Sequence, residues 1–187
     1  MKKLHLLFLG VAMLALTGAD CFLTSAQVLA TFDLPNPFTI DASNNMEELD
    51  VDLTTIEEYE DNKDKLKGLT DLAILGTFTN TSGPAGTVEV YISADENASF
   101  ANAAAVVAGA TKLWGPASIG PSTGPNNVVT LGWDESAALF NSAGKQILID
   151  EAKGDGHFKI WMVGTPGGTY NIRVDDGFIV LVLDAGV

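Results

Sequence analysis

The chain has 187 residues, of which 47% are hydrophobic, and its 24 acidic residues against 10 basic ones give a formal net charge of −14. The apolar fraction is too high for a disordered chain, and the length suits one domain with a core of its own. Because so acidic a chain repels nucleic acid and anionic lipid headgroups, neither is expected as a partner.

The beginning of the chain has the order of a bacterial secretory signal peptide. Two lysines give a positive start, an apolar run follows from 4 to 16, and small residues precede the first acid. The run is shorter than the ~20 apolar residues with which a helix spans a bilayer. Residues 1–20 are therefore predicted to be a signal peptide, with cleavage after Ala19 or near Cys21 or Ala26.

Cys21 is the only cysteine, so the chain cannot form an internal disulfide. The residues before it resemble the lipobox of bacterial lipoproteins, in which Leu, a small residue, and Gly or Ala precede the cysteine that becomes acylated. Leu16–Gly18 match its beginning, but Ala19 and Asp20 delay the cysteine by two residues. Lipid attachment at Cys21, with 22–36 as a tether, stays open, while these departures favour a soluble exported form.

Short segments with alternating or continuous apolar character predict strands. The first is 49–53, and the others in chain order are 72–78, 88–92, 128–131, 158–163, 170–175 and 178–183. The turn-rich segment 80–86 predicts a hairpin with a long loop, and Asp176-Gly177 predicts a tight type I′ hairpin. The last strand is apolar on both faces, so we expect it in the middle of a sheet.

One helix is predicted after the first strand, because Thr55 and Glu58 form a capping box and Gly68 can end the helix. Segments 100–110 and 135–143 are further helix candidates, although their small residues form no clear apolar stripe. Repeated alternation of strands and helices is absent. The fold class is therefore predicted as all-β and mostly antiparallel: a β-sandwich, jelly-roll or immunoglobulin-like in outline, with one or two short crossover helices.

The predicted organisation has three parts. The signal peptide, 1–20, is followed by an N-terminal extended segment, 21–47, and then by the β-sandwich domain, 48–187.

Residues for catalysis are scarce. His157 is the only histidine outside the signal segment, and no serine lies in a Gly-x-Ser-x-Gly motif. No glycine motif for binding phosphate or a dinucleotide occurs. The protein is therefore predicted not to be an enzyme and to use no cofactor, with calcium as the one open alternative.

The sequence contains two candidate ligand-binding sites. Trp114 and Trp133 flank a segment rich in Gly and Pro, where exposed rings could stack on sugars, whereas packing in the core is the alternative. Asp50 and Asp52 could supply carboxylates to Ca²⁺, although the spacing of a calcium loop is absent and the alternation alone explains them as the solvated face of a strand.

These observations predict an exported, non-catalytic structural or assembly protein of the cell envelope or extracellular matrix. Its partners would be other envelope or matrix proteins, or further copies of itself joined through the apolar C-terminal strand. The alternative is a glycan- or calcium-binding β-sandwich module. The expected location is periplasmic or extracellular, with membrane attachment only if Cys21 is lipidated.

Overall fold

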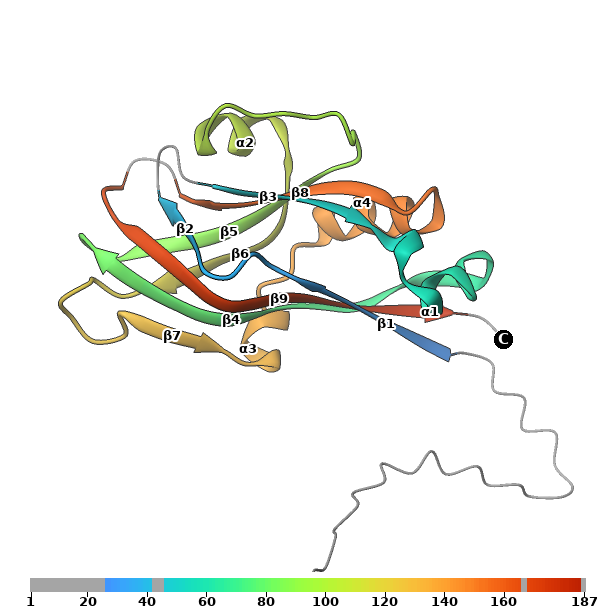
Figure 1. Ribbon diagram of the computed structural model, residues 1–187, viewed down its shortest axis with the longest axis horizontal. Coiled ribbons are helices and arrows are strands. Elements are labelled where there is room, and N and C mark those ends of the chain that lie inside the picture. Colours follow the sequence, from blue (N-terminus) through green and yellow to red (C-terminus); the bar gives the residue numbers. More distant parts are fainter. Residues whose placement is uncertain (1–25, 42–45, 166–167, 186–187) are drawn as a thin grey trace, which may run out of the picture.

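The computed structural model describes residues 26–41, 46–165 and 168–185. Nine strands within these ranges form two antiparallel sheets that face each other, with β4 and β9 in the lower layer of Figure 1 and β5 and β8 in the upper one. The five-stranded sheet has the order β1 (Ala26–Asp33), β9 (Asn171–Ala185), β4 (Leu66–Ser82) and β7 (Val128–Leu131), and β2 (Phe38–Asp41) also pairs with β9. The four-stranded sheet has the order β3 (Glu47–Asp52), β8 (His157–Gly164), β5 (Gly86–Ser93) and β6 (Thr111–Ile119). The prediction of a mostly antiparallel β-protein is confirmed.

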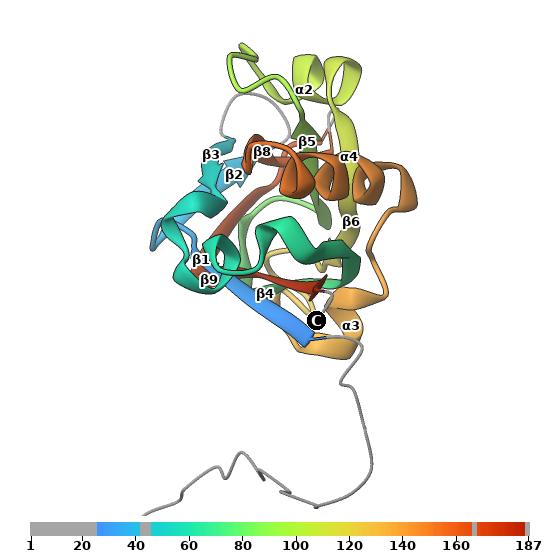
Figure 2. The ribbon, with the colours of Figure 1, turned by 90° about the vertical axis from the view of Figure 1, so that its right-hand side faces the viewer.

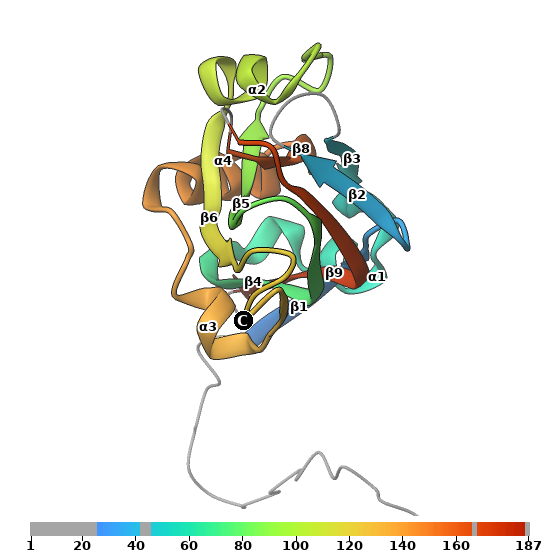
Figure 3. The same cartoon turned by 90° about the vertical axis from the view of Figure 1, so that its left-hand side faces the viewer.

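Short helices lie in the connections. They are α1 (Glu57–Glu60), α2 (Ala103–Gly109), α3 (Trp133–Ala137), α4 (Ser142–Lys153) and two 3₁₀ turns, η1 (Leu53–Thr55) and η2 (Lys63–Lys65). In both end views, α2 lies outside the four-stranded sheet, and α3 and α4 lie along one side of the sandwich (Figures 2 and 3). There α3 contacts β4 and α4 contacts β6. Within the described ranges, no helix is long and apolar enough to cross a membrane.

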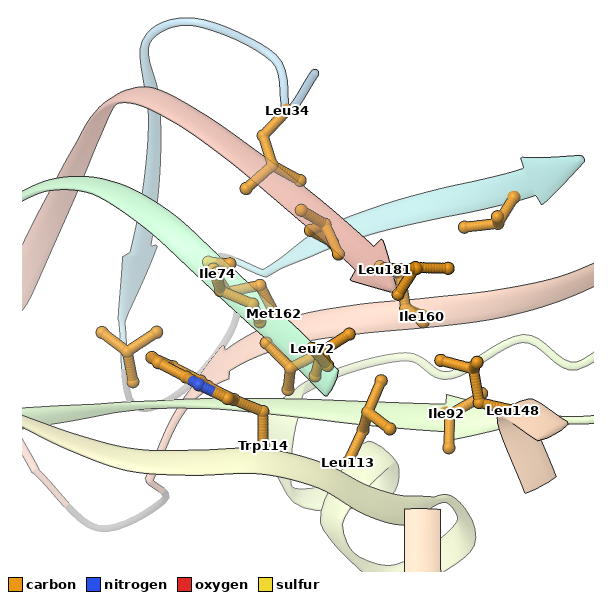
Figure 4. Close-up of a cluster of buried hydrophobic side chains, with 14 of the residues drawn as sticks. Leu34, Leu72, Ile74, Ile92, Leu113, Trp114, Leu148, Ile160, Met162 and Leu181 are labelled. Atoms are coloured by element: carbon orange, nitrogen blue, oxygen red, sulfur yellow. The ribbon is translucent and has the colours of Figure 1, made fainter. Parts of the chain in front are cut away.

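The core fills the space between the two sheets. On β8, Phe158, Ile160 and Met162 are buried at alternate positions, as the period-two pattern of 158–163 predicts. Figure 4 shows side chains from both sheets projecting into this cluster, among them Leu72 of β4 and Trp114 of β6. Each fully buried large apolar side chain contributes about 1.5 to 3 kcal/mol relative to exposure, so this cluster is the main source of stability.

Both predicted hairpins are wrong. Segment 80–86 does not join paired strands, because β4 and β5 belong to different sheets. At Asp176-Gly177 the chain does not turn back, since β9 continues through both residues. The register between β4 and β9 shifts there, so that Gly76 opposes two residues of β9 in a β-bulge. A positive φ followed by glycine suits a bulge as well as a turn, and Asp176 has a φ of 49°.

Asn36 holds this bulge from the neighbouring edge. Its Nδ2 donates to Oδ1 of Asp176 at 2.8 Å, and the backbone N–H of Asp176 donates to Oδ1 of Asn36 at 3.2 Å. The edge of the sheet is divided at the same place, because β1 pairs with β9 after the bulge and β2 pairs with β9 before it.

The predicted helix at 55–68 is also wrong in extent. Only α1 is helical, for a single turn, while Leu66 and Gly68 already lie in β4. Asp52 takes over the capping role, since its Oδ1 accepts the backbone N–H of Thr54 at 2.9 Å and thereby starts η1 instead. Thr55 donates its hydroxyl to the carbonyl of Asp52, so it caps no helix.

The other helices follow the sequence in part. The candidate at 100–110 contains α2, which Asn102 caps through its side chain. The candidate at 135–143 spans the end of α3, the link and the beginning of α4, and the main length of α4 has no counterpart among the predictions.

The sandwich also begins earlier than residue 48. Strands β1 and β2 lie within the segment 21–47 that was expected to be merely extended, and β3 begins at Glu47. Because β1 belongs to the sheet, most of the tether proposed for 22–36 is part of the folded domain.

Candidate functional site

The structure separates the two tryptophans that were expected to flank a ligand loop. Trp114 is fully buried, because it takes an inward position on β6 opposite Val90, and its Nε1–H donates to the carbonyl of Ser136 at 2.8 Å. Trp133 is half-buried at the start of α3 and donates to Oδ2 of Asp71 at 3.2 Å. Of the two alternatives for Trp114, packing in the core holds, and a ring exposed for stacking on sugars does not.

Asp50 and Asp52 lie, as the alternation predicts, on the outer face of β3. They border an open groove of about 300 Å³, whose other polar lining residues are Glu96, Asn97, His157 and Lys159. Lys159 Nζ lies 3.4 Å from Oδ1 of Asp50. Asp52 accepts hydrogen bonds from Thr54, which lower the pKa of its carboxyl, and its Oδ1 lies 3.7 Å from His157 Nε2.

These acids are therefore engaged with groups of the chain itself. Among the described residues, no three His, Cys, Asp or Glu side chains come together as a group that could hold a metal ion. Ca²⁺ needs six to eight oxygen ligands, so a site here would have to recruit most of them from elsewhere.

The outer face of the four-stranded sheet carries a buried polar network beneath the connection that contains α2. Glu89 is 5% exposed; its Oε2 accepts from the Tyr91 hydroxyl at 2.8 Å and its Oε1 accepts from Lys112 Nζ at 2.6 Å. Burial, together with Glu89, raises the pKa of Tyr91 far above its usual range. Phe100 packs edge-on against Trp161 with ring centroids 4.9 Å apart. Every buried polar side-chain atom of this network has a hydrogen-bond partner.

The C-terminal strand, which was expected to pair across subunits, lies in the middle of its sheet. β9 is paired with β1 and β2 on one side and with β4 on the other, so its expected central position is confirmed and it offers no free edge. Strand addition must therefore use one of the sheet edges among the described residues, and these edges differ.

Four of the edges are protected. β3 carries acids at its outer positions, β7 has only four residues, and β2 has four residues and follows Pro37. The edge of β6 is bent at Gly115-Pro116 and hydrogen-bonded to the link between α3 and α4, since the N–H of Gly115 donates to the carbonyl of Leu139 at 2.9 Å. Short, bent, charged or covered edges are the usual means of preventing unwanted pairing.

β1 has none of these protections. Its eight residues pair with β9 in an unbroken register, and they include no proline and no basic residue. Gln27, Leu29 and Thr31 are exposed, and Leu29, at 58%, is the most exposed large apolar side chain in the described structure. α1 lies near β1 and buries Tyr59 in the core, while these outer positions remain open.

The surface next to β1 carries apolar residues of β9 and, in a groove at the end of β1, polar and acidic residues. Leu29 lies opposite Val182, and Asp33 lies opposite Phe178, both on the outer face of the five-stranded sheet. Where β1 ends, Asp33, Asn36, Asp176 and Phe178 line an open groove of about 390 Å³. We call β1 with this adjoining groove the β1 edge.

The β1 edge could not be predicted from a strand pattern, because 21–47 shows no strict alternation of apolar and polar residues. The signal that could have revealed it is the spacing of Ala30 and Phe32, whose side chains turn toward the core, against Gln27, Leu29 and Thr31. Cys21 lies outside the described residues. Comparison with known proteins gives no further guide, since no family model and no curated protein matches the chain.

Proposed function

We propose that this chain is an exported, non-catalytic structural or assembly protein of the cell envelope or extracellular matrix, and that it joins its partners by strand addition at the β1 edge. The observation that carries the proposal is the contrast between β1, which is long, regular and uncharged from 26 to 32, and the other edges, which are short, charged, bent or covered. An unpaired edge strand presents a row of backbone donors and acceptors to any incoming strand.

The distribution of carboxylates supports a non-catalytic role. Glycoside hydrolysis needs two carboxyl groups about 5 to 10 Å apart at a substrate cleft. Glu89 is the one acid that is buried among the described residues, and Tyr91 and Lys112 occupy both of its oxygens. A glycan- or calcium-binding role has less support, because Trp114 is buried and the acids of β3 already contact Lys159 and Thr54.

Export is part of the same proposal and rests on the signal-peptide pattern of 1–20. We expect the mature protein to be soluble in the periplasm or outside the cell, with its first residue at Asp20 or Gln27. Mass spectrometry of the mature N-terminus tests this. An acylated Cys21 would replace the soluble form by a membrane-anchored one, and an intact Met1 in the cytoplasm would refute export.

The assembly role is tested in cells that produce the protein. We expect the wild-type chain to fractionate with high-molecular-mass envelope or matrix material, and Leu29→Lys to release it as a small soluble species. Val128→Lys is the matched control, since Val128 is 51% exposed on β7 at the opposite edge of the same sheet. Wild-type protein that is found only as a small soluble species would refute the proposal, as would equal incorporation of all three forms.

A further inference from the structure

We infer that the partner at the β1 edge is a second copy of this chain, paired antiparallel about a two-fold axis so that two five-stranded sheets become one continuous sheet. This inference rests on the proposed function, because it names the partner that binds the same edge. A two-fold pairing uses the same strand from both copies and therefore closes after two subunits, so the dimer would be the unit that is incorporated into larger envelope or matrix material.

The distribution of charge favours a second copy at β1 and not at another edge. Because each chain has a formal charge of −14, two copies repel each other, so association is least costly at the edge strand that carries the fewest acids. The outer positions of β3 are Glu48, Asp50 and Asp52, which would oppose the same acids of the second copy. β1 carries a single charge, Asp33, at its very end.

The antiparallel arrangement also keeps the two Asp33 side chains apart. Side chains alternate between the faces, so the two cores stay on one side when a residue lies opposite its own copy. The two registers of this kind that pair the most residues of β1 place Leu29 opposite Leu29 or Ala30 opposite Ala30. At about 3.4 Å per residue, both registers separate the two Asp33 residues by at least ~20 Å, which is about twice the Debye length at physiological salt. In the second register Asp33 lies opposite Gln27, whose amide can donate to it.

Leu29 supplies the apolar contact of this pairing. In the first register the two Leu29 side chains meet directly, and in the second they are diagonal neighbours across the new strand pair. Val182 of β9 lies beside Leu29 on the same face, so the exposed apolar surface of the two copies becomes continuous. A single strand pair buries less surface than a standard interface of about 1,600 Å², so we expect a weak, reversible dimer.

The test is analytical ultracentrifugation of the purified mature protein from about 10 µM to 1 mM. We expect a concentration-dependent change from monomer to dimer, a larger dimer fraction at higher salt because the net charges are screened, and a monomer throughout for Leu29→Lys. Val128→Lys should dimerise like wild type. Circular dichroism confirms that both variants are folded.

Hydrogen exchange locates the contact independently of the variants. The backbone amides of β1 should exchange more slowly as the protein concentration rises, and those of β7 should not change. A wild-type protein that is monomeric at about 1 mM in high salt, or a dimer that Leu29→Lys leaves intact, would overturn the inference.

The two proposals fail separately. A monomeric purified protein whose incorporation in cells still depends on Leu29 would leave the assembly role standing with a different strand as partner. A dimer in solution without any incorporation in cells would leave the pairing standing and remove the assembly role.

Discussion

Ser136 hydrogen-bonds to the backbone of β4 at a place where no strand of the described residues pairs with that side of β4. β7 pairs only with Gly76–Thr79, so the backbone of Ile74 has no strand on that side. Ser136 of α3 fills this place: its Oγ accepts the N–H of Ile74 at 2.7 Å and donates to the carbonyl of Ile74 at 2.8 Å, and the residue is fully buried. We predict that Ser136→Ala destabilises the protein, because it leaves both backbone groups buried without a partner.

The expected magnitude follows from these two groups. A buried polar group that loses its partner costs about 1 to 3 kcal/mol, so the loss of stability should reach roughly 2 to 4 kcal/mol once the burial cost of the hydroxyl itself is removed. For a domain of this size, 1 kcal/mol changes the Tm by about 2 to 4 °C, so the Tm should fall by about 5 to 15 °C.

Thermal and urea unfolding, followed by circular dichroism, measure this change. The control is Ser142→Ala, which removes the same hydroxyl from an exposed position at the start of α4 and should alter stability by no more than about 0.5 kcal/mol. A loss below about 1 kcal/mol for Ser136→Ala, or one equal to that of the control, would show that α3 does not close β4 through this side chain.

Three further substitutions test the packing and the charges. Glu47 lies at an apolar gap between the sheets, and burial raises the pKa of its carboxyl, so the charged form destabilises the fold at neutral pH. Glu47→Gln should therefore raise the Tm at pH 7. This gain should disappear below pH ~4, where glutamate is protonated in both the folded and the unfolded state. The hydrogen bond from Lys159 lowers the pKa of Glu48, so Glu48→Gln should lower the Tm at pH 7, with a difference that shrinks as the pH falls through the pKa of the folded state. Equal pH profiles for the two variants would contradict at least one of the two assignments. Gly144→Ala should destabilise the protein in urea although alanine favours helices, because its Cβ would lie 2.5 Å from the backbone of β6, and it should cost more than Ala143→Gly, which loses only the ~1 kcal/mol of helix propensity.

The strands could be predicted where one face of a segment is apolar and the other is not. In 49–53 Leu and Val alternate with Asp, and this segment overlaps β3, while the mainly apolar runs 158–163 and 128–131 form β8 and β7. The pairing of the strands could not be predicted, because Asp176-Gly177 has the same local signal in a hairpin and in a bulge. Only the long run of pairs between β4 and β9 decides between them, and those contacts join residues about 100 positions apart.

Prediction of the candidate site required even more knowledge of the tertiary structure. The residues after Trp114 have the composition of an exposed loop, yet β6 continues through Gly115-Pro116 and turns the indole inward. Leu29 is an unremarkable leucine in the sequence, and it becomes informative only because β1 is an edge strand on which this side chain stays exposed in the described structure. Exposure of this kind depends on which strand lies outermost, and that order is a property of the whole sheet.

The order of the five-stranded sheet also bears on export. Its central strand, β9, is the last strand of the described chain, and β1, β2 and β4 all pair with it. Contacts of such long sequence separation form only after the loop between them has closed, so this sheet cannot be completed before residues 171–185 are available. The sheet of a chain with this order stays incomplete until its last strand has been synthesised, which the proposed export of an unfolded chain would require. Until β9 has been synthesised, β1 has no partner strand among the described residues on either side. Once β9 pairs with β1, the backbone groups on one side of β1 are hydrogen-bonded, and those on the other side are available to the proposed second copy.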